Sequence, residues 1–275
     1  MSGTPVLRAG ILWRAGRNFL RDHGLNHAAA VSYFSLLSFG PFLLLVGRLI
    51  GSIAPAENLA ADIALRVSEF LPPALAPVVP SLTEGPAAGK GIVVVALPLL
   101  VWVASTAFSA LELSVNVAFA TTPRRRFLLS RLKAVAAVTA AAILLAGSLA
   151  VRHAVDWLDR YRERLGLPPA LGPRAAWISY LILLALAFVA FALFYKTLPR
   201  GKVSWRAATS SAAVALVLWE VARRVFGEAL LRSPGLGLLG GTLAGIVSFL
   251  LWNFTAVGIA LYGAEVAALL NGNRE

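Results

Sequence analysis

Four charged residues interrupt an otherwise apolar segment, LVLWEVARRVFGEALL, at residues 216–231. Helical spacing places Glu220, Arg223, Arg224 and Glu228, together with Gly227, on one face. On that face, we expect Glu220 to pair with Arg223 or Arg224, and Arg224 to pair with Glu228. Guanidinium groups also bind phosphates through paired hydrogen bonds. The stripe therefore predicts one of two structures: a polar cavity that binds an anionic substrate, or a self-neutralised ion-pair ladder.

Two more segments carry polar residues at helical spacing, and such residues inside a membrane usually face the bundle interior or a wet cavity. The first face, within residues 92–118, consists of Ser105, Ser109, Glu112 and Asn116. The second, within residues 236–270, consists of Gly241, Gly245, Ser248, Trp252, Thr255 and Tyr262, with Glu265 one turn beyond. These residues are candidates to line a polar path. Gly237, Gly241 and Gly245 form overlapping GxxxG patterns, which favour close helix packing over ligand binding. A proton- or ion-coupling role for Glu112, Glu220 or Glu265 stays open.

The residues needed for familiar catalytic centres are missing from the chain. It contains no cysteine, and its three histidines, His23, His27 and His153, match no HExxH or HxH motif. Gly235, Gly237 and Gly240 match GxGxxG but follow no predicted strand, and no GxSxG motif is present. We therefore expect no enzyme activity, no cofactor and no metal site.

The composition predicts an integral membrane protein of the all-α class. Hydrophobic residues make up 59% of the 275 positions and charged residues only 14%. A helix needs roughly 20 apolar residues to cross a bilayer. We expect a single domain over residues 1–275 with six spans, at about 28–53, 92–118, 132–151, 175–198, 207–231 and 236–270. The last stretch exceeds one span and should tilt or kink.

Two amphipathic helices are expected outside these spans. In residues 1–26, arginines interrupt any apolar core, so a cleavable signal peptide is not predicted. Val6, Ile11, Trp13 and Phe19 alternate with arginines there, a pattern that suits an anionic inner leaflet; a plain cytoplasmic flank is the alternative. The outer connection, at residues 57–71, repeats apolar residues at helical spacing and predicts a helix at the outer interface.

The charges of the connections predict the orientation. Residues 124–133 and 196–206 are rich in arginine and lysine and contain no acidic residue. Residues 54–90, by contrast, contain four acidic residues and two basic ones. By the positive-inside rule, we expect both termini to be cytoplasmic. The arginine-rich segment at residues 159–174 is the exception, because this scheme places it outside. Anionic inner-leaflet lipids are the expected partners of the basic loops, and topology explains the net charge of +12 without nucleic acid.

Four segments, AAAVSYFSLLSFGP (28–41), LELSVNVAF (111–119), ALVLWEVARRVFG (215–227) and GTLAGIVSFLLWNFTAVGIALYGAEV (241–266), carry a family resemblance. In order and spacing the chain resembles the YihY/BrkB family of bacterial inner-membrane proteins over nearly its whole length. The positions that match its motifs are Tyr33, Ser35, Pro41, Asn116, Glu220, Trp252, Gly263 and Glu265. Phe119 departs from the pattern, which has a tryptophan there.

The resemblance implies a role in the cell envelope and brings two labels, serum-resistance factor and ribonuclease BN. Metal-dependent ribonucleases need clustered His and Asp ligands, which this chain lacks, so the ribonuclease label is not supported by the residues. Two hypotheses follow. The protein is either a transporter or flippase-like conduit for an anionic amphiphile, a phospholipid or envelope precursor, or a non-transporting scaffold and envelope-integrity factor. Homo-oligomerisation stays open in both.

Overall fold

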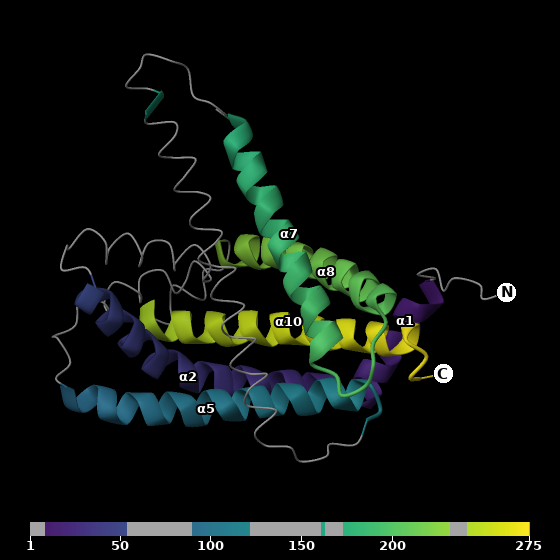
Figure 1. The fold of residues 1–275 in the computed structure, drawn as a ribbon, viewed down its shortest axis with the longest axis horizontal. Coiled ribbons are helices and arrows are strands. Elements are labelled where there is room, and N and C mark those ends of the chain that lie inside the picture. The colour runs from purple at the N-terminus through teal and green to yellow at the C-terminus, as the bar shows by residue number, and fades with distance from the viewer. Residues whose placement is uncertain (1–8, 54–89, 122–160, 163–172, 232–240, 275) are drawn as a thin grey trace.

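A computed structural model describes residues 9–53, 90–121, 161–162, 173–231 and 241–274 of the chain. The elements in these ranges are the helices α1 (Ala9–Arg21), α2 (Gly24–Ile53), α5 (Lys90–Ala118), α7 (Pro173–Thr197), α8 (Trp205–Leu231) and α10 (Gly241–Leu270). The described part of the chain contains no strand (Figure 1). The all-α prediction is confirmed to that extent.

The described helices coincide with five of the six predicted spans. Helix α2 continues through Pro41 and α5 through Pro98, as membrane helices tolerate. Within the described residues, Leu97–Ala118 of α5 and Ala244–Leu270 of α10 are long and apolar enough to cross a membrane. The predicted span at 132–151 and the outer-loop helix at 57–71 lie outside the described residues, so the number of six spans stays a prediction.

Helix α10 holds the central position in the bundle. It packs against α1, α2, α5, α7 and α8, while α2 pairs with α5, and α7 with α8. Figure 1 shows α10 between the α2–α5 pair on one side and α8 on the other. The end of α5, the α7–α8 turn, α1 and the end of α10 meet at one end of the bundle, where Ser204 and Asn271 hydrogen-bond across two of these segments.

Small residues allow α8 and α10 to approach closely. The buried alanines of this contact are Ala208, Ala212 and Ala215 on α8 and Ala264, Ala267 and Ala268 on α10. Alanine at such spacing removes the side-chain bulk that would separate two helices. Gly245 of the predicted GxxxG series is buried, whereas Gly237 lies outside the described residues. Close packing therefore involves alanines that the glycine pattern did not indicate.

Tyr195 of α7 fills the space above the small residues. Its side chain is fully buried, and its hydroxyl donates to the carbonyl oxygen of Ala260 at 3.1 Å. A Cβ added to Gly263 would lie 2.7 Å from Cζ of Tyr195, and closer still to its hydroxyl oxygen. It would also lie 3.3 Å from Cβ of Ala215. Gly263, one of the family-motif positions, is thus a glycine because a tyrosine ring lies against its backbone.

We expect Gly263→Ala to lower the free energy of unfolding by about 1–3 kcal/mol, because the added methyl group must displace a buried ring. The thermal midpoint of purified protein in detergent measures this loss. Gly258→Ala on the same helix is the matched control, since a Cβ there meets nothing within 4 Å. Equal midpoints for the two variants would contradict the packing role of Gly263.

Candidate functional site

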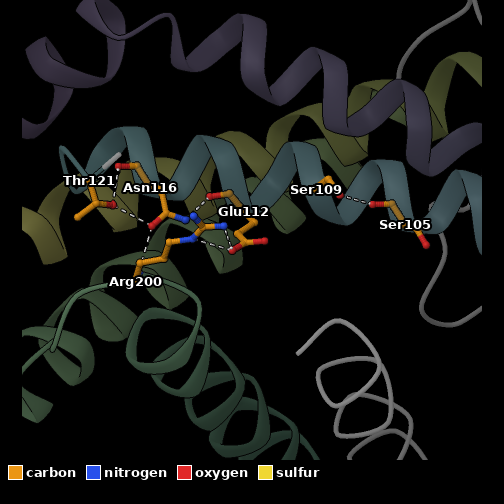
Figure 2. Close-up of polar contacts among 6 residues, drawn as sticks. All are labelled: Ser105, Ser109, Glu112, Asn116, Thr121 and Arg200. Carbon is orange, nitrogen blue, oxygen red and sulfur yellow. Dashed lines mark hydrogen bonds and ion pairs between the residues drawn. The ribbon is translucent and has the colours of Figure 1, made fainter. Parts of the chain in front are cut away.

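An ion pair connects α5 to the turn between α7 and α8. Nε and Nη2 of Arg200 donate to Oε1 of Glu112 at 3.1 and 2.9 Å. The backbone N–H of Arg200 donates to Oδ1 of Asn116 at 3.1 Å, and the Asn116 amide donates to the Glu112 carbonyl oxygen at 2.7 Å. Figure 2 shows the Arg200 side chain lying along α5, with Thr121 completing the cluster. Glu112 and Asn116 are both buried.

The end of α5 places these groups. Thr121 N–H bonds to the Asn116 carbonyl and Ala120 N–H to the Val117 carbonyl, both at 3.0 Å, and Ala120 has φ of 51°. This is the bonding of a Schellman motif, which ends a helix with a left-handed residue. This turn brings the Thr121 hydroxyl back to Asn116, where it donates a hydrogen bond to Oδ1 at 2.8 Å. One amide oxygen therefore accepts hydrogen bonds from both Thr121 and Arg200.

The rest of the predicted α5 face bonds within its own helix. Ser105 donates to the carbonyl oxygen of Val101, and Ser109 donates to that of Ser105 at 2.7 Å (Figure 2). Such bonds to the preceding turn satisfy a hydroxyl without another helix. The four residues of this face thus share a side of α5. In the hydrogen bonds described above, Glu112 and Asn116 bond to Arg200 of the α7–α8 turn, whereas Ser105 and Ser109 bond within α5.

A second buried ion cluster lies where α1, α10 and the chain after α10 meet. Nη1 of Arg274 pairs with Oδ2 of Asp22 and lies 3.4 Å from Oε2 of Glu265. Nη2 of Arg274 donates to the carbonyl oxygen of Val117, near the end of α5. Glu265 is almost fully buried and Arg274 nearly so. The fold thus buries the carboxylates of both Glu112 and Glu265 against arginines.

In the charged stripe of α8, both arginines bond to the carboxylate of Glu220. Arg223 donates Nε to Oε2 of Glu220 at 3.0 Å and Nη2 to Oε1 at 2.7 Å, while Arg224 donates Nε to Oε1 at 2.8 Å. Tyr180 of α7 donates its hydroxyl to the same Oε1 at 2.6 Å. The Arg223 and Arg224 side chains stay 46% and 68% exposed. Arg224 therefore bonds to Glu220, and Glu228, one turn further along α8, is exposed.

The predicted residues of α10 divide between the two ends of the helix. Trp252 contacts Trp219 and Phe226 of α8, with ring centroids 6.0 and 5.3 Å apart. Thr255 donates to the Leu251 carbonyl at 2.8 Å, and Tyr262 to the Leu12 carbonyl of α1 at 3.0 Å. Ser248 is buried, and its hydroxyl has no hydrogen-bond partner among the described residues. The α10 face thus contacts both α8 and α1.

The family-motif residues of α2 lie apart from these clusters. Tyr33 is exposed and stacks edge-on against Phe34, with centroids 5.6 Å apart. Ser35 accepts a hydrogen bond from Ser38 through its carbonyl oxygen at 2.8 Å, and Pro41 lies within the helix. Phe119, where the family pattern has tryptophan, is buried at the end of α5.

Four partners were not identified from the sequence: Arg200, Arg274, Asp22 and Tyr180. From the sequence, Arg200 is only one of the basic residues that predict the orientation of the chain in the membrane. Nothing in its own segment indicates a partner 88 residues earlier. Tyr180 and Glu220 are 40 residues apart, on different helices. The described polar residues thus form three ion clusters. The Glu112 cluster lies where the α7–α8 turn meets the end of α5. The Glu265 cluster lies where α1 meets the end of α10. The Glu220 cluster lies four to five turns along α8.

Comparison with known proteins gives a consistent picture. The family described as virulence factor BrkB matches residues 15–275. A UPF0761 membrane protein of Chromohalobacter salexigens is 27% identical over 94% of this chain and 62% of its own length. A UPF0761 membrane protein of Alkalilimnicola ehrlichii is 29% identical over 98% of this chain and 60% of its own length. The chain thus spans about three fifths of the length of these relatives. No solved structure matches the chain.

We expect Arg200→Gln to lower the free energy of unfolding by about 3–5 kcal/mol, because Glu112 would lose a buried charged partner. Thermal unfolding in detergent measures the effect, and adding Glu112→Gln to the same protein should restore part of the loss. Arg206→Gln, an exposed arginine six residues later, is the control and should leave the midpoint nearly unchanged. A similar loss in Arg200→Gln and Arg206→Gln would mean that the ion pair contributes little.

Proposed function

The chain belongs to the virulence factor BrkB family, and we propose that it acts as a conduit for an anionic amphiphile in the bacterial inner membrane. The amphiphile is a phospholipid or an envelope precursor, whose phosphate is met by Arg223 and Arg224. The observation that carries this proposal is the sharing of a single carboxylate, Glu220, by two exposed arginines.

The charge of this cluster favours an anion. Glu220 is shared by two exposed arginines, and arginine keeps its charge at any physiological pH. Glu220 takes both oxygens of its carboxylate to hold Arg223, which leaves the flat guanidinium fixed in orientation. A fixed guanidinium binds a phosphate with less loss of side-chain entropy than a mobile one. The Tyr180 hydroxyl in turn fixes Glu220 from α7.

The depth of the cluster suits a headgroup site away from the cytoplasmic end. Glu220 lies thirteen positions after Ala207, which corresponds to about 20 Å of helix, whereas the hydrocarbon core is about 30 Å thick. Charges at that depth are expensive unless they face protein or water. An anionic headgroup that crosses the membrane would meet its compensating charge there.

The two other ion clusters would control the opposite end. Glu112 with Arg200 connects α5 to the α7–α8 turn, and Arg274 connects α1, α5 and α10. Charged hydrogen bonds between helices can separate and re-form without disturbing the alanine core. In the proposed mechanism these clusters are closed when the arginine cluster is accessible, and they open when the headgroup moves toward the cytoplasm.

The same contacts support a second candidate, a scaffold without transport. Every ion cluster of the described chain contains both signs of charge. In a scaffold, the clusters would hold helices together and bind no ligand. In this function Glu220, Arg223 and Arg224 would contribute to stability alone. The two candidates differ in whether removal of the arginines changes lipid transfer in a folded protein.

We expect purified protein in liposomes to transfer fluorescent phospholipid between leaflets, and Arg223→Ala/Arg224→Ala to reduce the rate at least about tenfold. A single charged contact to a phosphate contributes roughly 1.5–3 kcal/mol, and a factor of ten corresponds to about 1.4 kcal/mol. Glu220→Gln should also slow transfer, because it releases the two guanidiniums from their fixed positions. The measurement is dithionite quenching of labelled phosphatidylglycerol and of a labelled envelope precursor, each in separate liposomes.

Lys202→Ala/Arg206→Ala is the matched control, since it removes two exposed basic residues from the other end of the same hairpin. It should transfer lipid at the unmodified rate. Absence of transfer by the unmodified protein with both labels would rule out the conduit. Unmodified transfer rates in Arg223→Ala/Arg224→Ala, with a normal elution profile, would exclude the arginine cluster and favour the scaffold.

A further inference from the structure

Helix α1 presents a sharply divided surface at the end of the bundle, and we infer that this surface binds an anionic phospholipid layer. This inference rests on the contacts of α1 alone and does not depend on transport. The α1 surface consists of Trp13, Arg14, Arg17, Leu20 and Arg21, all of which are exposed.

The buried side of α1 fixes which residues face outward. Ala15 and Asn18 are buried, and the Tyr262 hydroxyl of α10 donates to the carbonyl oxygen of Leu12 at 3.0 Å. At the end of the helix, Asp22 pairs with Arg274. These contacts hold both the first and the last turn of α1 against the end of α10 and the chain that follows it. The helix therefore cannot rotate to bury its outer side.

Apolar and basic residues occupy different edges of the α1 surface. Trp13 and Leu20 are seven residues apart, which is close to two helical turns, so they lie along one edge; their exposed fractions are 76% and 62%. Arg14 and Arg21, also seven residues apart, lie along the opposite edge, with Arg17 between the two. Helices that lie in a bilayer surface show this division, with apolar side chains among the acyl chains and arginines at the phosphates.

The charge of the α1 surface selects an anionic layer. In the part of the chain that the structure describes, neither Arg14 nor Arg17 is paired with a carboxylate, while Arg21 lies 3.4 Å from Asp22. Juxtamembrane arginines and lysines each contribute attraction to anionic lipids. Exposed tryptophan and leucine beside the arginines favour a lipid layer over a nucleic acid.

The position of α1 also places it at the membrane surface. It lies beside the last turns of α10, whose apolar segment ends at Leu270 (Figure 1). A tryptophan at the end of a spanning segment lies typically at the headgroup level. From there Trp13 and Leu20 can enter the layer without moving α1 away from α10.

A spin label on a single cysteine tests the inference in the intact protein. The chain has no cysteine of its own, so Leu20→Cys gives one labelling site. In nanodiscs that contain phosphatidylglycerol, the label should be more accessible to oxygen than to a water-soluble nickel relaxer. In purely zwitterionic nanodiscs, or at high salt, the label should move toward water.

Arg14→Gln/Arg17→Gln in the labelled protein should abolish the difference between anionic and zwitterionic nanodiscs. Lys202→Gln/Arg206→Gln is the matched control, because it removes two exposed basic residues outside α1 and should preserve the difference. A label that is aqueous in both lipids, or immersed to the same depth in both, would overturn the inference. Protection of the label by added RNA, without a response to lipid charge, would assign the α1 surface to nucleic acid and overturn it too.

Discussion

A buried charge must find an opposite charge or water, and this constraint organises the described structure. Glu112, Glu265 and Glu220 each lie against arginine. For Glu112 and Glu265 the partner comes from a different segment of the chain, so the ion pair also determines which segments meet. The turn between α7 and α8 rests on α5 because Arg200 contacts Glu112 and Asn116 there. Helix α1 is held at the end of α10 in the same way, through Asp22 and Arg274.

Between these ion clusters the bundle depends on small side chains. Alanines of α8 and α10 and Gly263 allow close helix approach, and Tyr195 fills the space that they leave. Lipid provides no hydrophobic drive for helices to associate, so such packing must come from close contact and hydrogen bonds. The proposed conduit requires the polar clusters at the helix ends to rearrange while this packing stays in place.

The described clusters differ in how much charge they expose. Glu112 and Glu265 are buried, and each cluster with its arginine holds helices of one end together. The α8 cluster holds two arginines on one glutamate, and both guanidiniums stay accessible. Exposed guanidiniums held in a fixed geometry are what the proposed conduit requires for binding a phosphate. The α8 cluster is therefore the part of the molecule on which the conduit and the scaffold make opposite predictions.

The sequence by itself determined the helical class, the membrane family and the face on which Glu220, Arg223 and Arg224 lie. These features depend on hydrophobicity and on spacing within one helix, which are local properties. Only the tertiary structure decided that both arginines bond to Glu220, that Tyr180 joins them, and that Arg200 and Arg274 meet Glu112 and Glu265. Trp13 was grouped with Phe19 from the sequence, yet packing against α10 leaves Trp13 exposed. For Tyr180 and Arg200 the physical reason is that contacts between segments far apart in the chain depend on how helices pack, and helical spacing carries no information about the neighbouring helix.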